Sequence, residues 1–340
     1  MRTPLPARSS RAHRSLTVVA VTALVSLGLA ACGSSEDDGG EGAETSQTRV
    51  FAADNGEITI PADPQRVVAT GYAVPVLIEA DAELVGISEW SRGLPLMSDE
   101  HAATYEELPK VAGETAAATS YEAVAEADPD LIVIGVPQPA LVDLDMEKLE
   151  SIAPVVVIGP TVPDAWKTDS EKQADAAGAL EGFEEARDAY TERVEELKAE
   201  HADTLDGLAF GHVGAYGDIS AGSFHREFAG SWGTNIATDV GVTYTGEVKK
   251  KGGGSADVSE YPSIEELPEA FADVDVITYT VGPDGKPSEE VQYVLDSQLW
   301  KNLPAVEAGR TLGLRFTEAV TYTSALKTLD ALDAALDELR

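Results

Sequence analysis

Aromatic and arginine side chains recur in the loops that follow the apolar segments of this 340-residue chain. Aromatic residues make up only 6% of the sequence, so their gathering in these loops is informative. The candidates are Tyr72, Trp90, Arg92, Tyr216, Phe224, Arg226, Trp232, Arg315, Phe316 and Tyr322. Aromatic rings stack on apolar surfaces, and guanidinium groups hydrogen-bond oxygen atoms in a planar fork. The combination predicts a site for a bulky, partly polar small molecule.

Sequence signatures of catalysis are missing. The chain has no G-x-S-x-G elbow, no P-loop and no H-E-x-x-H motif. Carboxylate pairs carry little information, because 60 acidic residues create such pairs by chance. We therefore expect no catalytic residues and a protein that is not an enzyme.

Histidines are too few for a closed metal site. Of five histidines, His13 lies in the N-terminal leader, and His101 and His201 lie on segments that we expect to be exposed. His212 and His225 remain, and two nitrogen ligands do not complete a metal site. We predict no metal site and no permanently bound cofactor.

The body alternates short apolar strands with helices. Strands are predicted at residues 66–70, 83–87, 128–134, 155–158, 207–213, 274–279 and 310–314, and helices at 72–80, 120–127, 146–152 and 324–339. Apolar strands separated by helices indicate parallel sheets covered on both faces. Residues 164–203 instead carry one helical stripe, in which Gly182 predicts a kink or two abutting helices. The expected fold is α/β, with two Rossmann-like lobes of parallel sheet, a long joining helix and a ligand cleft at the strand ends.

The N-terminus has the features of an export signal. Arg2 to Arg14 form a basic region, and the apolar run from Leu16 to Leu29 is too short to span a bilayer comfortably. The following Leu-Ala-Ala-Cys32 resembles the bacterial lipobox, in which the cysteine is acylated and becomes the first mature residue. An ordinary A-x-A cleavage site is the alternative. Cys32 is the single cysteine, which excludes an intrachain disulfide.

These features predict five parts of the chain. A signal peptide occupies residues 1–31, and the acylated cysteine with a flexible acidic tether occupies 32–49. The N-terminal lobe spans 50–163, the interlobe helix 164–203, and the C-terminal lobe with its closing helix 204–340.

The charge of the chain limits its partners. The sequence has 24 basic and 60 acidic residues and a net charge of −36. Removing the four arginines of the signal leaves a mature charge of about −40. Such a surface repels nucleic acid and anionic headgroups, so we expect attachment to the membrane by lipid alone. It also favours a neutral or cationic ligand over a highly anionic one.

The order of several segments carries a family resemblance. "GEITIPADPQRVVAT", "ELVGISEW", "SYEAVAEADPDLIVIG", "SIEELPEAFADVDVITY" and "LWKNLPAVEAGRTLGL" follow one another as in the siderophore and cobalamin group of ABC-importer substrate-binding proteins. The resemblance covers the chain after the tether. It implies lobes joined by a single long helix, a trapped iron chelate, haem or corrinoid, and delivery to a membrane permease.

Two glutamates match the permease-docking acids of that family. Glu122 follows Ser120, and Glu265 follows Ser263, each at the expected start of a helix. Such acids also suit helix N-termini for purely local reasons, so capping is the alternative role.

The resemblance leaves the ligand open. A ferric siderophore of hydroxamate type is favoured, because the chelator fills the iron coordination sphere and needs no protein ligand. Haem would require an axial ligand such as His225, Tyr216 or Tyr322, and cobalamin also stays open. We expect a monomer extracytoplasmically anchored through Cys32, and we expect Lys249 to Gly254 to form a mobile loop.

Overall fold

The computed structural model describes residues 47–217 and 219–340. The predicted signal peptide, Cys32 and the tether as far as residue 46 lie outside the described residues. The described chain begins with a hairpin of β1 (Thr48–Ala53) and β2 (Gly56–Pro61). Its turn is fixed to the neighbouring sheet, because the amide of Asn55 donates to the Val155 carbonyl at 3.0 Å. Thr48 and Arg49, the last residues of the predicted tether, thus lie in β1.

The N-terminal lobe is built on a fully parallel sheet. Its strands are β3 (Val67–Gly71), β4 (Leu84–Ser88), β5 (Lys110–Ala112), β6 (Leu131–Gly135) and β7 (Val155–Val157), in the order β5-β4-β3-β6-β7. Its helices are α1 (Ala73–Glu79), α2 (Asp99–Glu107), α3 (Tyr121–Glu126) and α4 (Met146–Glu150). The chain runs outward from β3 to β5 and then returns beside β3 as β6. The carboxyl end of β3 is therefore a topological switch point, where ligands bind in such sheets.

The C-terminal lobe has a mixed sheet. Its strands are β8 (Phe210–Gly214), β9 (His225–Glu227), β10 (Ser259–Glu260), β11 (Val276–Thr280) and β12 (Thr311–Leu314), in the order β10-β9-β8-β11-β12. Strands β8, β11 and β12 are parallel, whereas β9 runs antiparallel to β8 and β10 runs antiparallel to β9. The expectation of a fully parallel second sheet is wrong at this edge, because β9 follows β8 through a loop and not through a crossover helix. The helices are α7 (Asn235–Val240), α8 (Leu267–Ala270), α9 (Glu289–Asp296), α10 (Gln298–Lys301) and α11 (Pro304–Glu307).

Two helices occupy the segment between the lobes. Helix α5 (Trp166–Ala176) ends before Gly178, whose φ of 72° breaks the helical path, and α6 (Leu180–Leu205) then continues to the second lobe. The break was expected at Gly182, but α6 runs through that residue. A Cβ at Gly182 would lie 2.6 Å from the carbonyl oxygen of Ala80. This glycine therefore permits close packing of α6 against the end of α1, and it does not bend the helix.

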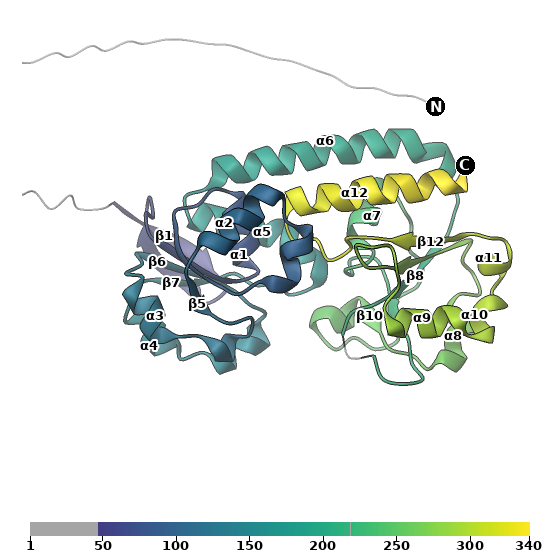
Figure 1. The fold of residues 1–340 in the computed structure, drawn as a ribbon, viewed down its shortest axis with the longest axis horizontal. Coiled ribbons are helices and arrows are strands. Elements are labelled where there is room, and N and C mark those ends of the chain that lie inside the picture. The colour runs from purple at the N-terminus through teal and green to yellow at the C-terminus, as the bar shows by residue number, and fades with distance from the viewer. Residues whose placement is uncertain (1–46, 218) are drawn as a thin grey trace, which may run out of the picture. The chain divides into compact units, whose positions relative to one another are not determined.

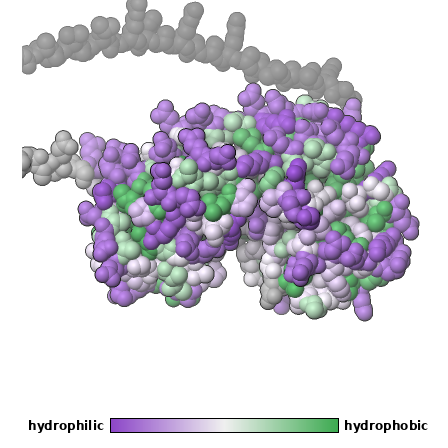
Figure 2. All heavy atoms as spheres, viewed as in Figure 1, coloured by the Kyte–Doolittle hydropathy of each residue, from purple (hydrophilic) through white to green (hydrophobic). Residues whose placement is uncertain are grey.

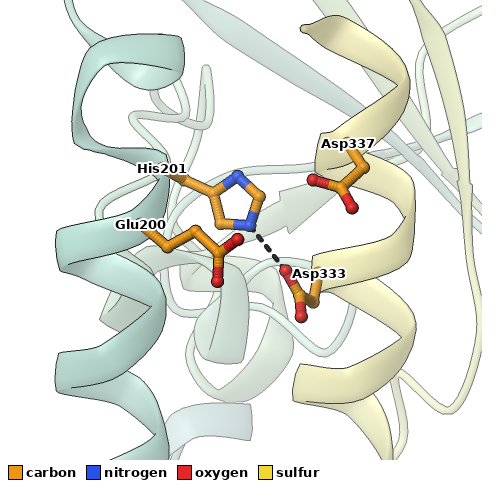
Figure 3. A group of neighbouring side chains, drawn as sticks. All are labelled: Glu200, His201, Asp333 and Asp337. Carbon is orange, nitrogen blue, oxygen red and sulfur yellow. Dashed lines mark hydrogen bonds and ion pairs between the residues drawn. The ribbon is translucent and has the colours of Figure 1, made fainter.

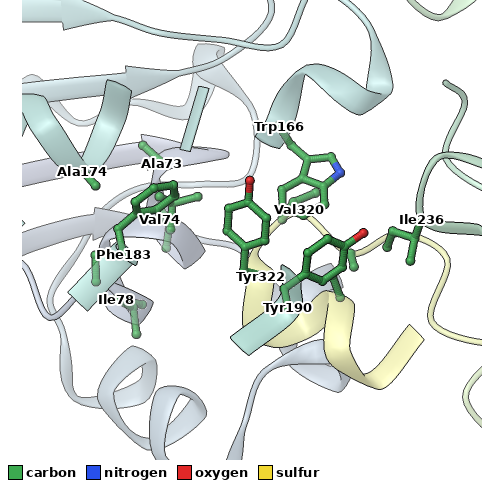
Figure 4. Packing of buried hydrophobic residues seen from close by; sticks show 14 of the residues in the cluster. Ala73, Val74, Ile78, Trp166, Ala174, Phe183, Tyr190, Ile236, Val320 and Tyr322 are labelled. Atoms are coloured by element: carbon green, nitrogen blue, oxygen red, sulfur yellow. The ribbon is translucent and has the colours of Figure 1, made fainter. Parts of the chain in front are cut away.

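The last long helix, α12 (Tyr322–Leu336), returns along α6 (Figure 1). It begins against the N-terminal lobe, where the Glu79 carboxylate accepts hydrogen bonds from the Thr323 amide at 3.1 and 3.2 Å. Figure 4 shows the rings of Trp166, Phe183, Tyr190 and Tyr322 packed together at this place. These rings belong to one buried cluster with members from both lobes, so the hydrophobic core is continuous across the junction.

Polar side chains dominate the visible face of the molecule in Figure 2, and an indentation separates the lobes on the side away from α6. Within the described part of the chain, none of the helices is both long and apolar enough to cross a membrane.

Candidate ligand-binding site

A cavity of about 280 Å³, here called the central cavity, lies between the lobes where strands of both sheets end. Tyr72 directly follows β3, and Trp90 and Arg92 follow β4. From the second lobe come Tyr216, which follows β8, and Trp232, in the loop after β9. The structure thus brings five of the ten sequence-predicted ligand residues to the walls of one cavity.

The aromatic rings of this cavity contact one another across the lobes. The rings of Tyr72 and Trp232 are parallel within 5° at a centroid distance of 6.0 Å, and the ring of Trp90 meets Tyr72 edge-on at 4.9 Å. The Arg92 guanidinium lies over Trp90 at 4.0 Å and Tyr72 at 5.1 Å from the ring centroids. Arg92 is exposed, and it makes no ion pair with another described residue. Its hydrogen-bonding edge is therefore available to a ligand.

Two further polar groups in the cavity wall find no hydrogen-bond partner within the described parts of the chain. They are the indole nitrogen of Trp90 and both ring nitrogens of His225. His225 is 2% exposed, and its ring stacks on Tyr261 at 4.7 Å and 11°. Burial lowers the pKa of His225 to about 4, so the ring is neutral at pH 7. A buried polar atom without a partner is costly, and a ligand that hydrogen-bonds these groups recovers that cost.

A buried hydrogen-bond network stands behind His225. The Glu227 carboxylate accepts hydrogen bonds from the Ser231 hydroxyl at 3.0 Å and the Gly233 amide at 2.8 Å. Its other close neighbour is Nε2 of His212, at 3.2 Å. Burial lowers the pKa of His212 to about 3 and raises the pKa of Glu227 to about 7. The contact is therefore not an ion pair below about pH 7, where His212 is uncharged and Glu227 is largely protonated.

Tyr216 also keeps its proton. Burial raises the pKa of its phenol well above the ordinary value, and its hydroxyl contacts the Thr317 hydroxyl. Tyr216 and His225, the two sequence-predicted haem ligands that line the central cavity, are of types that can ligate haem iron, as are Tyr72, Met97 and Tyr261 in the same wall. Both ring nitrogens of His212 already contact threonine hydroxyls: Nδ1 contacts Thr278 at 2.7 Å, and Nε2 contacts Thr280 at 3.1 Å.

Four predicted ligand residues lie elsewhere. Phe224 is fully buried against Phe271, and Arg226 pairs with Glu260 at 3.6 Å. Side chains alternate along a strand, so the pattern that turns His225 and Glu227 towards the cavity turns Phe224 and Arg226 to the opposite face. Arg315 is exposed and borders no described cavity; its guanidinium lies over Phe316.

Tyr322 is 8% exposed and lies in the core, where its hydroxyl donates to the Lys167 carbonyl at 3.3 Å. The expectation that it faces the cleft, or could ligate haem, is contradicted by this position. The chain after β12 crosses back to the first lobe before α12 begins, and sequence periodicity did not reveal that crossing.

Phe316 lines a neighbouring cavity of about 510 Å³, here called the side cavity, which shares Arg92, Leu96, Tyr216 and Glu318 with the central one. Sequence reasoning missed several other wall residues: Met97, Ser231, Ser255, Ser259, Tyr261 and Glu318. Alternation along β9 and β10 was the signal that could have found Ser259, but both strands were overlooked.

The basic run at Lys249 to Gly254 makes defined contacts. The Lys249 ammonium pairs with Glu266, and the amides of Gly252 and Gly253 donate to the Asp257 carboxylate at 3.1 and 2.9 Å. The expected mobile loop is thus a segment with its own hydrogen bonds, and its far end brings Ser255 to the central cavity.

A cluster of possible metal ligands lies far from this site, between α6 and α12. Figure 3 shows Glu200, His201, Asp333 and Asp337, whose ligand atoms lie within 4.8 Å of one another. His201 is fully buried and contacts Asp333 at 2.7 Å, so the expectation that it is exposed is wrong.

Two arginines pair with the carboxylates of this cluster. Arg340 pairs with Asp337 at 2.8 Å and Glu200 at 3.2 Å, and Arg193 pairs with Asp333 at 2.8 Å. We therefore interpret the group as an ion-pair network that joins the two helices, and not as a metal centre.

The two predicted docking glutamates are exposed on different lobes. Glu122 lies in the first turn of α3, where the Ser120 hydroxyl accepts from the Ala123 amide. Glu265 lies in the 3₁₀ turn before α8, where the Ser263 hydroxyl accepts from the Glu265 amide. Both α3 and α8 lie on the side of their lobes away from α6 and α12 (Figure 1).

The raised pKa of Glu227 predicts a pH dependence of stability. Its pKa of about 7 lies above the ordinary 4.5, so the folded protein binds the proton more tightly than the unfolded chain. The resulting stabilisation is full below pH 4.5 and disappears as the pH rises through 7. Glu227→Gln removes this loss, so the unfolding free energy of the variant relative to wild type should increase by about 3 kcal/mol over that range. Urea denaturation at several pH values measures it.

The matched control is Glu126→Gln, which removes one exposed carboxylate from α3. If the stability of Glu227→Gln stayed parallel to wild type across this pH range, Glu227 would be ionised in the folded protein and the neutral network would be wrong.

Comparison with known proteins extends these findings. The sequence matches the periplasmic binding protein family over residues 67–316. It is 27% identical to the iron(3+)-hydroxamate-binding protein YxeB of Bacillus subtilis (strain 168), over 83% of this chain and 82% of that protein. It is 25% identical to the iron(3+)-hydroxamate-binding protein FhuD of the same strain, over 88% of this chain and 91% of the relative.

The fold is also similar to solved structures. The siderophore periplasmic binding protein from the fuscachelin gene cluster of Thermobifida fusca is 31% identical, with a TM-score of 0.64 over 82% of this chain and 98% of that chain. Staphylococcus aureus SirA, solved with staphyloferrin B, shares the fold at 21% identity and a TM-score of 0.63, over 86% of this chain and 98% of its own.

The two-lobed α/β architecture and the family resemblance predicted from the sequence are both confirmed, with the mixed second sheet as the correction. The chain belongs to the periplasmic binding protein family and is an extracytoplasmic substrate-binding protein, not an enzyme.

Proposed function

We propose that this protein captures a ferric siderophore of hydroxamate type outside the cell and delivers it to the permease of an ABC importer. The observation that carries the proposal is the central cavity, where Tyr72 stacks on Trp232 of the other lobe and the Arg92 guanidinium lies over Tyr72 and Trp90 without an ion-pair partner among the described residues. Rings suit the apolar backbone of such a chelator, and Arg92 suits its metal-bound oxygens. One chain supplies both walls of the cavity, so the protein binds one ligand as a monomer.

The chemistry of the relatives supports this choice of ligand. Both Bacillus subtilis relatives are named as iron(3+)-hydroxamate-binding proteins, and the Thermobifida fusca protein belongs to a siderophore gene cluster. The net charge of −36 favours ferric hydroxamates, which are neutral or cationic, over highly anionic chelates. Haem is the second candidate, because the unpartnered nitrogens of His225 line the same cavity.

Tryptophan fluorescence tests the ligand class. Trp90 and Trp232 line the central cavity, so ferric hydroxamates should quench emission saturably at one ligand per chain, whereas haem, cobalamin and ferric catecholates should bind more weakly. Arg92→Gln should weaken hydroxamate binding about ten- to hundredfold, because it removes hydrogen bonds from a charged group.

Arg315→Gln is the control, since Arg315 is equally exposed but borders neither cavity. Absence of saturable quenching by every ferric hydroxamate would reject the proposed ligand, and tight haem binding would replace it. Equal losses in both arginine variants would remove Arg92 from the site.

We propose that Glu122 and Glu265 dock the two lobes onto the permease. Both are exposed, and each follows a serine that caps the helical turn in which the glutamate lies. Replacing both by alanine should abolish uptake of iron-55-labelled siderophore into cells and leave the ligand affinity of the purified protein unchanged.

Glu126→Ala with Glu269→Ala is the matched control, because Glu126 is an exposed acid of α3 and Glu269 is an exposed acid of α8, the helix that follows the turn of Glu265. Normal uptake by the Glu122 and Glu265 double variant would show that these residues only cap helices. Reduced ligand affinity of the double variant would also contradict the docking role, because the loss of uptake would then follow from weaker ligand binding.

We also propose that Cys32 is acylated and anchors the protein to the outer face of the membrane, with the acidic segment after it as a tether. The support is the sequence alone: a basic and apolar leader, the lipobox-like Leu-Ala-Ala-Cys32 and the lack of any second cysteine. Cys32→Ala should move the protein from the detergent phase to the aqueous phase in a phase-partition assay. Retention of the variant in the detergent phase would require another means of attachment.

A further inference from the structure

The side cavity extends the binding site beyond the central cavity. Its volume is about 510 Å³, and it continues from the central cavity past Arg92, Leu96, Tyr216 and Glu318, which line both. Most of its wall comes from the second lobe, at the end of β11 and in the loop at residues 281–288. Its apolar side chains include those of Leu96, Val281 and Phe316, so an alkyl segment can lie against it.

Glu318 stands where the two cavities meet. It is exposed to the cleft and forms no hydrogen bond or ion pair with another described residue. The protein around it removes part of its solvation and raises the pKa of the carboxyl, while the Arg92 charge lowers it. The carboxyl group thus has no direct partner among the described residues, and an approaching cation favours its ionised form.

The other charges of the side cavity are already engaged. The Lys286 ammonium pairs with Asp284 at 3.0 Å, and the Arg92 guanidinium rests on the rings of Trp90 and Tyr72. Arg92 lies more than 4 Å from Glu318, since no ion pair joins them. Glu318 therefore supplies the negative charge that is left for a ligand in this part of the cleft.

We propose that the side cavity is a subsite for a ligand arm that ends in a protonated amine, with Glu318 as the counter-ion. The inference rests on the proposed function and narrows the ligand to linear hydroxamate chelates that carry a terminal ammonium. The ferric centre and its chelating groups occupy the central cavity beside Arg92, and the alkyl arm follows the apolar wall to Glu318. A compact chelate without such an arm leaves the side cavity to solvent.

An alternative role for Glu318 is a direct pair with Arg92 when the lobes move closer. That pair would strengthen the binding of every ferric chelate, with or without an amine. The two roles therefore differ in which ligands respond to loss of the carboxylate.

The test compares ferrioxamine B, a linear trihydroxamate complex with one terminal ammonium, with its N-acetyl derivative, which keeps the chelating groups and loses the charge. Wild-type protein should prefer ferrioxamine B by roughly tenfold in Kd, as expected for one partly exposed charged contact. Glu318→Gln should bind both complexes with the affinity that wild type shows for the acetylated one. Glu318→Asp should keep part of the preference.

The matched control is Glu289→Gln, which removes an exposed acid beside the side cavity from a position outside its wall, and it should retain the full preference. Equal wild-type affinity for both complexes would overturn the subsite while leaving the proposed function intact. Equal weakening of both complexes in Glu318→Gln would overturn it in favour of the Arg92 pair. Failure of wild type to bind either complex would overturn the hydroxamate function and the subsite together.

Discussion

The packing of α12 against α6 is the contact on which the arrangement of the two lobes depends. Helix α6 carries the chain from the first lobe to the second, and α12 returns alongside it. At one end of the pair Tyr322 packs among the rings of Trp166, Phe183 and Tyr190. About 16 Å along α12, from Tyr322 to Asp333, ion pairs of Arg193 with Asp333 and of Arg340 with Glu200 join this part of the chain to α6. The lobes are therefore held by two helices and one continuous core, where the sequence predicted a single helix.

The packing of α6 against α12, here called the brace, limits how far the lobes can move around the cleft. Large hinge motions would have to break a core that is packed at the density of a crystal, so we expect the lobes to rotate only slightly when a ligand binds. The stacked rings of Tyr72 and Trp232, one from each lobe, already lie 6.0 Å apart. A cavity whose walls are held by such a core loses little conformational entropy when it binds a ligand. The stiffness of the brace and the pre-arranged aromatic wall are thus two consequences of the same packing.

The parts of the site that could be predicted are those set by strand ends. Tyr72, Trp90, Arg92 and Tyr216 follow strands whose apolar runs are plain in the sequence, and the carboxyl ends of parallel strands share one edge of a sheet. The predictions of ligand residues became wrong where the strands are not parallel or where the chain crosses between the lobes. Strand β9 is three residues long and antiparallel, so its alternating pattern is too short to recognise in the sequence. Phe224 and Arg226 were therefore predicted to face the ligand, whereas His225 between them does. Tyr322 was misplaced for a longer-range reason, since only tertiary packing determines that the chain returns to the first lobe before α12 starts.

Several polar groups around the central cavity lack a hydrogen-bond or ion-pair partner among the described residues. Elsewhere in the described chain some acids and bases pair, as in the network of Arg340, Glu200 and Asp337, although Asp169, Gln173 and Glu260 also have a buried oxygen without a hydrogen-bond partner. In the cleft the indole nitrogen of Trp90 and the ring nitrogens of His225 lack a hydrogen-bond partner, and the guanidinium of Arg92 and the carboxylate of Glu318 lack an ion-pair partner, among the described residues. Leaving such groups unpaired costs stability, and the cost is tolerated where a ligand supplies the missing partners. Because these donors and the acceptor stand at different walls, the ligand that satisfies them all must present oxygens and a cation at separate points. Charge pattern, more than cavity size, is therefore what should distinguish the ligand of this protein from those of its relatives.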